Sequence, residues 1–356
     1  MKKYRVLAIN PGATSTKLGV YEDEECLWKE NLEHPHQELL RYEKSTDQFE
    51  YRLGKILEAL AVRGFSLEDF DAVVGRGGPI KPVPGGTFEV NEKLLDDLRH
   101  HARVDHPSVL GGILAHELAK ERKIPSFIVD PVSVDEFEPV ARVSGLKGME
   151  RQSLWHALNS RAAAHSIARK LGRPYRELNL IVVHLGSGIS VSAHRRGRVV
   201  DVNMPNEEGP FSPERCGGLP ANQLVKLCFS GKYTQKEIID RLIKKGGVFS
   251  YKGTKDMREL ERMMDDGDEE ARLLYEAMAY QVAKEVGAMA TVLEGEVDRI
   301  VITGGIAYSK RFVGLIKQRV DFLARTEVLP GEEELEALSQ GALRVLRGEE
   351  EAKTYQ

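Results

Sequence analysis

The 356-residue chain is poor in cysteine and has no excess of basic residues. Its three cysteines, Cys26, Cys216 and Cys228, show no Cys-x-x-Cys spacing, which excludes the common zinc and dithiol motifs. We therefore expect ordinary buried thiols in a reducing compartment. Lysine plus arginine number 51 against 55 acidic residues, a formal charge of -4. This balance offers no broad attraction to nucleic acid or anionic lipid, so a small-molecule partner is expected.

The chain also lacks a long apolar run. The opening "MKKYRVLAINPGA" carries two lysines, but its apolar run stops at Asn10 and Pro11. It therefore predicts neither a signal peptide nor a membrane span. With 41% hydrophobic and 30% charged residues, the composition is typical of a soluble globular protein, and we predict a cytoplasmic location. At this length, two domains of ordinary size are expected.

One pattern of short strands and turns occurs twice. Near the N-terminus, residues 6–9 and 18–21 flank the glycine turn in "NPGATSTK", and "ECLWKENLEH" supplies a third strand. The order returns with a strand at 180–184, the turn "GSG", and strands at 189–193 and 199–202. Alternating strands and helices follow, so the sequence predicts two copies of one α/β unit. The alternative is a chance likeness between two hairpins.

Helical periodicity is clearest in residues 271–293. Six apolar side chains recur there on one helical face, which predicts a core helix with methionines as filler. They are Leu274, Met278, Val282, Val286, Met289 and Leu293. Similar patterns predict helices at 51–60, 106–121, 151–171 and 335–348.

Glycine-rich turns at three strand ends could hold phosphate groups, because a residue without Cβ lets an anion approach backbone N–H groups. Ser15 and Lys17 accompany the first turn, Ser187 the second, and Gly304 and Gly305 follow a buried strand. No GxxxxGK[ST] motif is present and no GxGxxG follows the first strand, so a nucleotide would be held in another way. Taken singly, each turn also fits a plain hairpin or strand-to-helix connection.

Together the motifs resemble a known family. "INPGATSTK", "HLGSGIS" and "TGGIA" are similar, in this order, to the phosphate and adenosine loops of the acetate and sugar kinase, heat-shock chaperone and actin superfamily. "GRGGP", "DHPSVLGGILA", "SLWHALNSRAAA" and "PFSPERCGGLP" resemble the acetokinase family, and within it the butyrate kinases. Ala13, Thr14 and Ser187 depart from the acetate kinase pattern.

The resemblance implies an α/β fold of two duplicated ribonuclease-H-like domains with a nucleotide cleft between them. The first would span residues 1–148 and be completed by helix 335–348. The second, at 149–334, would carry the adenosine site. The implied ligands are ATP or ADP and Mg²⁺.

The resemblance also implies roles for individual residues. Asn10, Ser15 and Lys17 would contact the ATP phosphates. Arg76 and Arg215 would bind the substrate carboxylate and the migrating phosphoryl group, because a guanidinium presents two parallel donors to planar oxygens. The remaining nucleotide-binding residues would be His184, Gly186, Ser187, Gly188, Asp256, Arg258, Gly304, Gly305 and Ile306.

Two histidines and two carboxylates complete the implied site. His106 would bind substrate and His156 would donate a hydrogen bond to the phosphoryl group, although a histidine after tryptophan is otherwise typical of a packed core. Asp130 and Glu333 would hold the Mg²⁺ ion. Outside this family context Asp130 is a turn residue. Glu333 is one of three consecutive glutamates, 332–334, so the choice among them, or a solvated helix start, stays open.

The implied reaction is reversible in-line phosphoryl transfer from ATP to a short-chain carboxylate, butyrate or isobutyrate, giving an acyl phosphate. An acetate or propionate kinase would differ only in the acyl pocket, where one methylene is worth roughly 1 to 3 kcal/mol. An ATPase scaffold of the actin or chaperone kind is the alternative of another class, and it gives the paired arginines no clear use. A homo-oligomer of at least two chains is also expected.

Overall fold

The computed structural model describes residues 2–356, which fold into two compact units. The first comprises the chain up to Val134 together with Glu333–Gln356, and the second comprises Asp135–Glu332. The sequence predicts boundaries at 148/149 and 334/335 instead. The segment after Val134 lies with the second unit because the backbone N–H of Glu138 donates to the carbonyl of Val200 at 3.2 Å.

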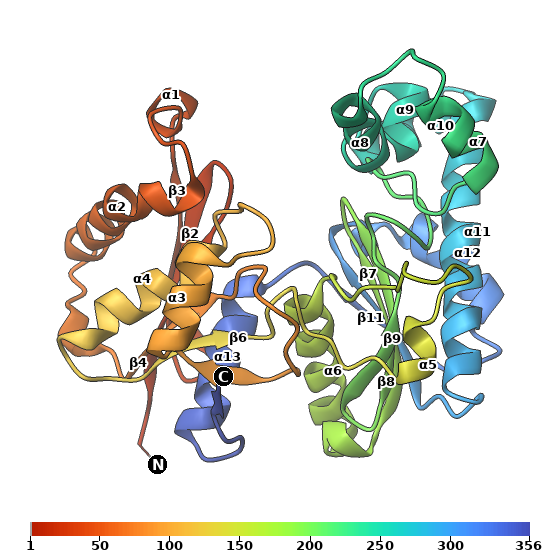
Figure 1. Ribbon diagram of the computed structural model, residues 1–356. Helices are drawn as coiled ribbons and strands as arrows, with labels where there is room; N and C mark the ends of the chain where they lie inside the picture. Colours follow the sequence, from red (N-terminus) through yellow and green to blue (C-terminus); the bar gives the residue numbers. More distant parts are fainter. Residues whose placement is uncertain (1) are drawn as a thin grey trace. The chain divides into compact units, whose positions relative to one another are not determined.

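The first unit is built on a seven-stranded sheet (Figure 1). Its order is β12-β5-β6-β4-β1-β2-β3, in which β1, β2 and β3 form an antiparallel meander and β4 and β6 run parallel to β1. The strands are β1 (Arg5–Pro11), β2 (Ser15–Glu22), β3 (Glu25–Glu33), β4 (Ala72–Arg76), β5 (Thr87–Glu89), β6 (Ser126–Val129) and β12 (Lys353–Thr354).

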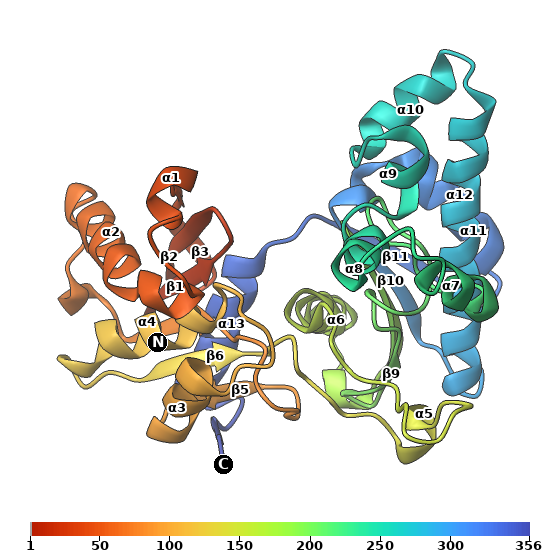
Figure 2. The ribbon, with the colours of Figure 1, turned by 45° about the horizontal axis from the view of Figure 1, so that its top comes forward.

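Helices cover both faces of this sheet. Leu7, Ile9 and Val73 face a core that α2, α3 and α4 complete. On the opposite face, Leu335 and Gly341 of α13 contact Gly19 and Val129. The helix at the C-terminal end of the chain therefore closes the N-terminal sheet, as its blue colour among the red and orange elements shows (Figure 2). The helices are α1 (His36–Leu39), α2 (Phe49–Val62), α3 (Glu92–His100), α4 (Val109–Lys120) and α13 (Glu334–Leu346).

The second unit repeats this plan with five strands in the order β11-β10-β7-β8-β9. They are β7 (Asn179–Leu185), β8 (Ile189–Arg195), β9 (Arg198–Val202), β10 (Arg299–Gly304) and β11 (Thr326–Pro330). The strands β7, β8 and β9 form the meander, and β10 and β11 run parallel to β7. Both sheets thus share a meander followed by two parallel strands. The predicted duplication and the α/β fold class are confirmed.

Alternation of side chains along the strands decides which helices cover each face of the second sheet. Leu180 and Val182 pack on α6, whereas Ile181 and Val183 pack on α11 and α12. The six apolar residues predicted to share one helical face are all buried, five of them in α11 and Leu293 directly after it. The helices are α5 (Pro139–Arg142), α6 (Ala157–Leu171), α7 (Ala221–Cys228), α8 (Gln235–Ile243), α9 (Gly247–Lys252), α10 (Met257–Asp265), α11 (Glu269–Val292) and α12 (Lys310–Val320).

Two sequence-based expectations about smaller features are wrong. The helix expected over 151–171 begins only at Ala157, because the preceding segment is irregular. The thiols are not buried, since Cys26 and Cys228 are exposed and Cys216 is partly exposed. Within residues 2–356, no helix has the length and apolar character that crossing a membrane requires.

The helix α4 approaches β4 so closely that only glycine fits at the contact. A Cβ on Gly111 would lie 2.2 Å from the carbonyl oxygen of Arg76. A Cβ on Gly54, in α2, would meet nothing within 4 Å. This contact therefore fixes the end of β4 at Arg76.

Alanine substitution at these two helical glycines should have opposite effects. Gly111→Ala is expected to lower the free energy of unfolding by about 3 kcal/mol, because the added methyl group overlaps the backbone of β4. Gly54→Ala should raise it by up to about 1 kcal/mol through backbone entropy alone. Urea denaturation of both variants and the parent measures the difference. Equal stability of the two variants would contradict the tight contact.

Candidate active site

The carboxyl ends of three parallel strands in the second unit form one polar edge. Thr303 pairs with His184 and Gly304 pairs with Pro330, so β7, β10 and β11 end side by side. A pocket of about 710 Å³ opens there, a volume that suits a ligand of nucleoside size. Among its lining residues are six of those predicted to bind nucleotide: Gly186, Ser187, Asp256, Arg258, Gly305 and Ile306.

The glycine turn after β7 is shaped around an arginine. A Cβ on Gly188 would lie 2.3 Å from Nη1 of Arg215, so the guanidinium rests directly on the turn. The turn itself closes through the backbone N–H of Gly186, which donates to the carbonyl of Gly188 at 3.1 Å. Any side chain at position 188 would displace Arg215, so glycine is needed there for close approach.

Arg215 is held by a short loop that is tied to the same turn. The hydroxyl of Ser212 donates to the carbonyl of Ser187 at 2.5 Å and accepts from the backbone N–H of Arg215 at 3.2 Å. Among the described residues 2–356, the buried Nε of Arg215 has no hydrogen-bond partner, and burial lowers the pKa of the guanidinium. The group remains charged at neutral pH, because an arginine side chain is not deprotonated there. A partly buried cation with a spare donor suits an anion.

Two of the predicted histidines stack on each other beside this turn. The rings of His156 and His184 are 4.2 Å apart at an angle of 23°. Nδ1 of His156 lies 2.8 Å from the hydroxyl of Ser190, and Nε2 of His184 lies 3.3 Å from a carboxylate oxygen of Glu332. His156 immediately precedes α6, so the start of that helix fixes its ring over β7.

Asp256 and Arg258 form a wall of the pocket by pairing with each other. The Asp256 carboxylate accepts from the backbone N–H of Arg258 at 2.9 Å, which caps α10, and from its guanidinium at 2.7 Å. These hydrogen bonds lower the pKa of Asp256 to about 2. The pair thus shapes the pocket rim and stabilises the helix start.

The first unit has a corresponding edge. Ile9 pairs with Gly75 and Arg76 pairs with Val129. Asn10, Arg76 and Asp130 therefore lie at the carboxyl ends of the adjacent strands β1, β4 and β6. In open α/β sheets this edge is where ligands bind.

A glutamate joins two of these residues. Asn10 donates to one carboxylate oxygen of Glu334 and Arg76 donates to the other, each at 2.5 Å. Glu333, the residue proposed from the sequence, is exposed and pairs with Lys29 at 2.5 Å. The three consecutive glutamates therefore have different surroundings, since Glu332 lies beside His184. Only Glu334 joins Asn10 and Arg76.

Asp130 and His106 are both held by neighbouring backbone. Asp130 is buried with a positive φ of 39°, and its carboxylate accepts from the N–H of Gly86 at 2.7 Å. It therefore has a turn role besides any ligand role. Nδ1 of His106 accepts from the N–H of Ser108 at 3.1 Å. Burial, with the nearby positive charge of Arg76, lowers the pKa of His106, so the ring is neutral at pH 7.

The pairing of β1 with β2 decides on which face of the hairpin each side chain near the first glycine turn lies. Lys17 opposes Asn10 across the hairpin, and Ser15 lies two residues earlier, so all three belong to one face. Thr16 points to the other face and is buried. The predicted phosphate-binding residues Asn10, Ser15 and Lys17 are therefore grouped.

Comparison with known proteins identifies part of the chain. Residues 151–327, which contain the histidine pair, Arg215 and all lining residues of the pocket except Glu332, match the model of the acetokinase family. The chain carries an acetokinase domain. This domain indicates a phosphotransferase of the carboxylate kinase type and leaves the acyl chain of the substrate open.

Solved structures of the same fold extend over nearly the whole chain. Acetate kinase of Porphyromonas gingivalis is 21% identical, with a TM-score of 0.80 over 96% of this chain and 100% of that one. Acetate kinase of Entamoeba histolytica is 17% identical, with a TM-score of 0.74 over 95% and 99%. A propionate kinase of Francisella tularensis is 17% identical, with a TM-score of 0.72 over 95% and 98%. The acetokinase domain and the N-terminal unit together thus have the fold of these solved structures.

Sequence reasoning missed residues that support the candidate site. Ser212 orients the Arg215 loop, and the "SPER" pattern of a serine three residues before arginine was the available signal. Glu332 lines the pocket and meets His184. Glu334 was one of three open choices, and its position at the first turn of α13 decides its direction.

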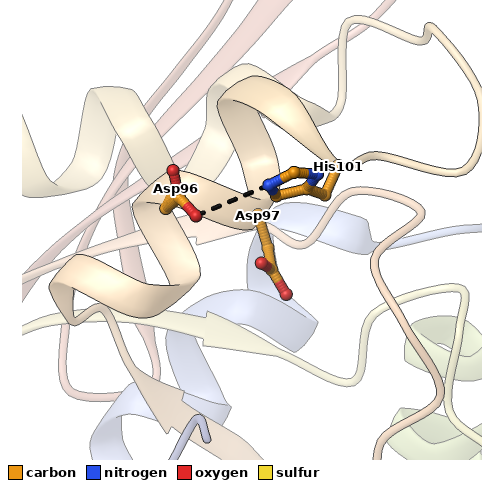
Figure 3. A group of neighbouring side chains, drawn as sticks. All are labelled: Asp96, Asp97 and His101. Atoms are coloured by element: carbon orange, nitrogen blue, oxygen red, sulfur yellow. Dashed lines mark ion pairs between the residues drawn. The ribbon is translucent and has the colours of Figure 1, made fainter.

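A separate cluster, Asp96, Asp97 and His101, has the composition of a metal site (Figure 3). The carboxylate of Asp97 already has protein partners, because it accepts from Lys93 at 2.8 Å and from the hydroxyl of Tyr355 at 2.7 Å. His101 lies 3.7 Å from Asp96. We assign this cluster to the stability of α3.

Proposed function

We propose that this protein reversibly transfers the γ-phosphoryl group of ATP to a short-chain carboxylate, with butyrate or isobutyrate preferred. The observation that carries the proposal is Arg215, partly buried against the glycine turn that lines a nucleoside-sized pocket within an acetokinase domain. The products would be ADP and an acyl phosphate. A carboxylate is already a nucleophile, so no general base and no covalent enzyme intermediate are needed.

The groups of the pocket suit this transfer. Adenosine would lie along Gly305, Ile306 and the rim formed by Asp256 and Arg258, and backbone N–H groups of the turn at 186–188 would face phosphate. Arg215 would stabilise charge that spreads over the phosphoryl oxygens, since its fork binds two oxygens at once. His156 would donate a further hydrogen bond to the phosphoryl group.

The edge of the first unit suits the remaining roles. Asn10, Ser15 and Lys17 would contact phosphate, and Arg76 with His106 would bind the substrate carboxylate. Asp130 and Glu334 offer the carboxylate oxygens that Mg²⁺ prefers, and we propose Glu334 in place of Glu333 because it contacts Asn10 and Arg76. When bound, magnesium would neutralise phosphate charge. A homo-oligomer of at least two chains and a cytoplasmic location stay predictions.

A carboxylate panel tests both the reaction and the acyl preference. Purified protein is supplied with MgATP and acetate, propionate, butyrate, isobutyrate or valerate, while ADP release and acyl phosphate trapped as hydroxamate are measured. We expect kcat/KM for butyrate or isobutyrate to exceed that for acetate by about tenfold or more, as the extra methylenes are buried in the acyl pocket. The closer resemblance of the sequence motifs to the butyrate kinases supports this preference.

Other outcomes of the panel would point elsewhere. A higher kcat/KM with acetate or propionate would retain the reaction and correct the acyl chain. ADP release that is equal with and without carboxylate, and that yields no hydroxamate, would favour an ATPase scaffold.

A further inference from the structure

A buried arginine lies directly beneath the first glycine turn. The side chain of Arg52, on α2, is fully buried. Its guanidinium donates to the carbonyl oxygens of Gly12 and Ser15 and to the hydroxyl of Thr16, each at 2.9 Å. Its other two donors bind the side-chain oxygen of Gln48 at 3.0 and 2.8 Å. All of the N–H groups of a guanidinium are therefore used.

The acceptors around Arg52 are all neutral. Within the described residues 2–356, no carboxylate forms an ion pair with this guanidinium. Burying a cation without a counter-charge is costly, and burial lowers the pKa of Arg52 to about 10. The side chain nevertheless stays charged at neutral pH. A side chain that served only to hold the turn in place would need hydrogen bonds but no charge.

The neighbouring histidine adds no second charge. Nε2 of His34 lies 2.8 Å from the hydroxyl of Thr16. Burial, with the positive charges of Arg52 and Lys55, lowers the pKa of His34 to about 4. The cluster thus carries the single charge of Arg52.

We propose that Arg52 is a positioning residue for an anion-binding turn. It holds residues 12–16 from the buried face, and its charge favours a polyphosphate on the exposed face. The inference rests on the proposed function in taking that ligand to be the phosphate chain of a nucleotide. Arg52 acts through the turn, because its donors are all bound to protein oxygens.

The test compares Arg52→Met and Arg52→Lys with a matched control. Arg344→Met breaks an ion pair in the same unit, where Arg344 donates to Glu350 at 2.8 Å. For each full-length variant, the thermal unfolding midpoint is measured with and without inorganic tripolyphosphate, and kcat and the KM values for ATP and butyrate are measured.

We expect tripolyphosphate to raise the midpoint of the wild type and of Arg344→Met. Arg52→Met should lose this rise and show a KM for ATP that is higher by about tenfold or more, with the KM for butyrate little changed. Arg52→Lys should keep part of the rise, because it retains the charge but cannot reach all the acceptors.

Three results would overturn the inference. The first is a wild type that tripolyphosphate does not stabilise. The second is a folded Arg52→Met that retains the full rise and the parental KM for ATP, which makes Arg52 a structural pin only. The third applies if Arg52→Met does not fold: it is an Arg52→Lys protein with the parental rise in midpoint and the parental KM for ATP. A further result would separate the two proposals. If the wild type forms no acyl phosphate but is stabilised by tripolyphosphate, and Arg52→Met is not stabilised, the proposed function is refuted and the inference is supported.

Discussion

Replacing Arg215 with alanine is expected to lower kcat about a hundredfold, or by about 3 kcal/mol of transition-state stabilisation. The guanidinium is partly buried against the turn at Gly188, and among residues 2–356 its Nε has no hydrogen-bond partner, so its charge acts where solvent screens it less. Arg215→Lys should lose less, because lysine keeps the charge but not the two-pronged fork. Steady-state kinetics with the preferred carboxylate give both values.

Arg173→Ala is the matched control for Arg215. Arg173 belongs to the same unit but lies at the surface, where it pairs with Asp298 at 2.7 Å. Its loss should leave kcat unchanged. Circular dichroism melts of all three variants separate lost catalysis from lost folding. A folded Arg215→Ala protein with near-parental kcat would remove Arg215 from the proposed mechanism.

The second large effect distinguishes two adjacent glutamates. Glu334→Gln is expected to lower kcat by about a hundredfold, since the carboxylate that joins Asn10 and Arg76 would become neutral. Glu333→Gln should change kcat by less than about twofold, because an exposed ion pair contributes little. Both substitutions preserve size, so kinetics compare charge alone.

The magnesium dependence of these variants adds a second measurement. If Glu334 helps to hold Mg²⁺, its variant should need a higher magnesium concentration for half-maximal rate, whereas Glu333→Gln should not. The reverse order, with Glu333→Gln the impaired variant, would restore the residue chosen from sequence. Equal and full activity in both would place the metal-side carboxylate elsewhere.

Much of the fold followed from local patterns. The strands β1, β2 and β7 are short runs of mostly buried residues closed by turns, and α11 has strict helical spacing, so period and turn chemistry were sufficient. The glycine turns also lie at strand ends, as predicted. The segment 151–156 shows where this reasoning fails, because its polar and apolar residues fit a helix that tertiary packing does not form there.

The site was less predictable because its side chains meet across long sequence separations. The choice among the three glutamates depends on where α13 begins, which no run of identical residues can show. Arg52 shares a helical face with Ile56 and Leu60, and that placement in a core-facing stripe was a signal that the sequence offered. That signal does not show that Arg52 would bind Gly12, Ser15 and Thr16.

The sequence by itself determined the duplicated α/β plan and the chemistry available at the strand ends, because hydrophobic period and glycine placement act over a few residues. Only the tertiary structure decided that Gly188 supports Arg215, that Glu334 bridges Asn10 and Arg76, and that Arg52 lies under the first turn. The physical reason is that hydrogen bonds and burial of charge depend on positions fixed to within fractions of an ångström, which the packing of distant elements sets.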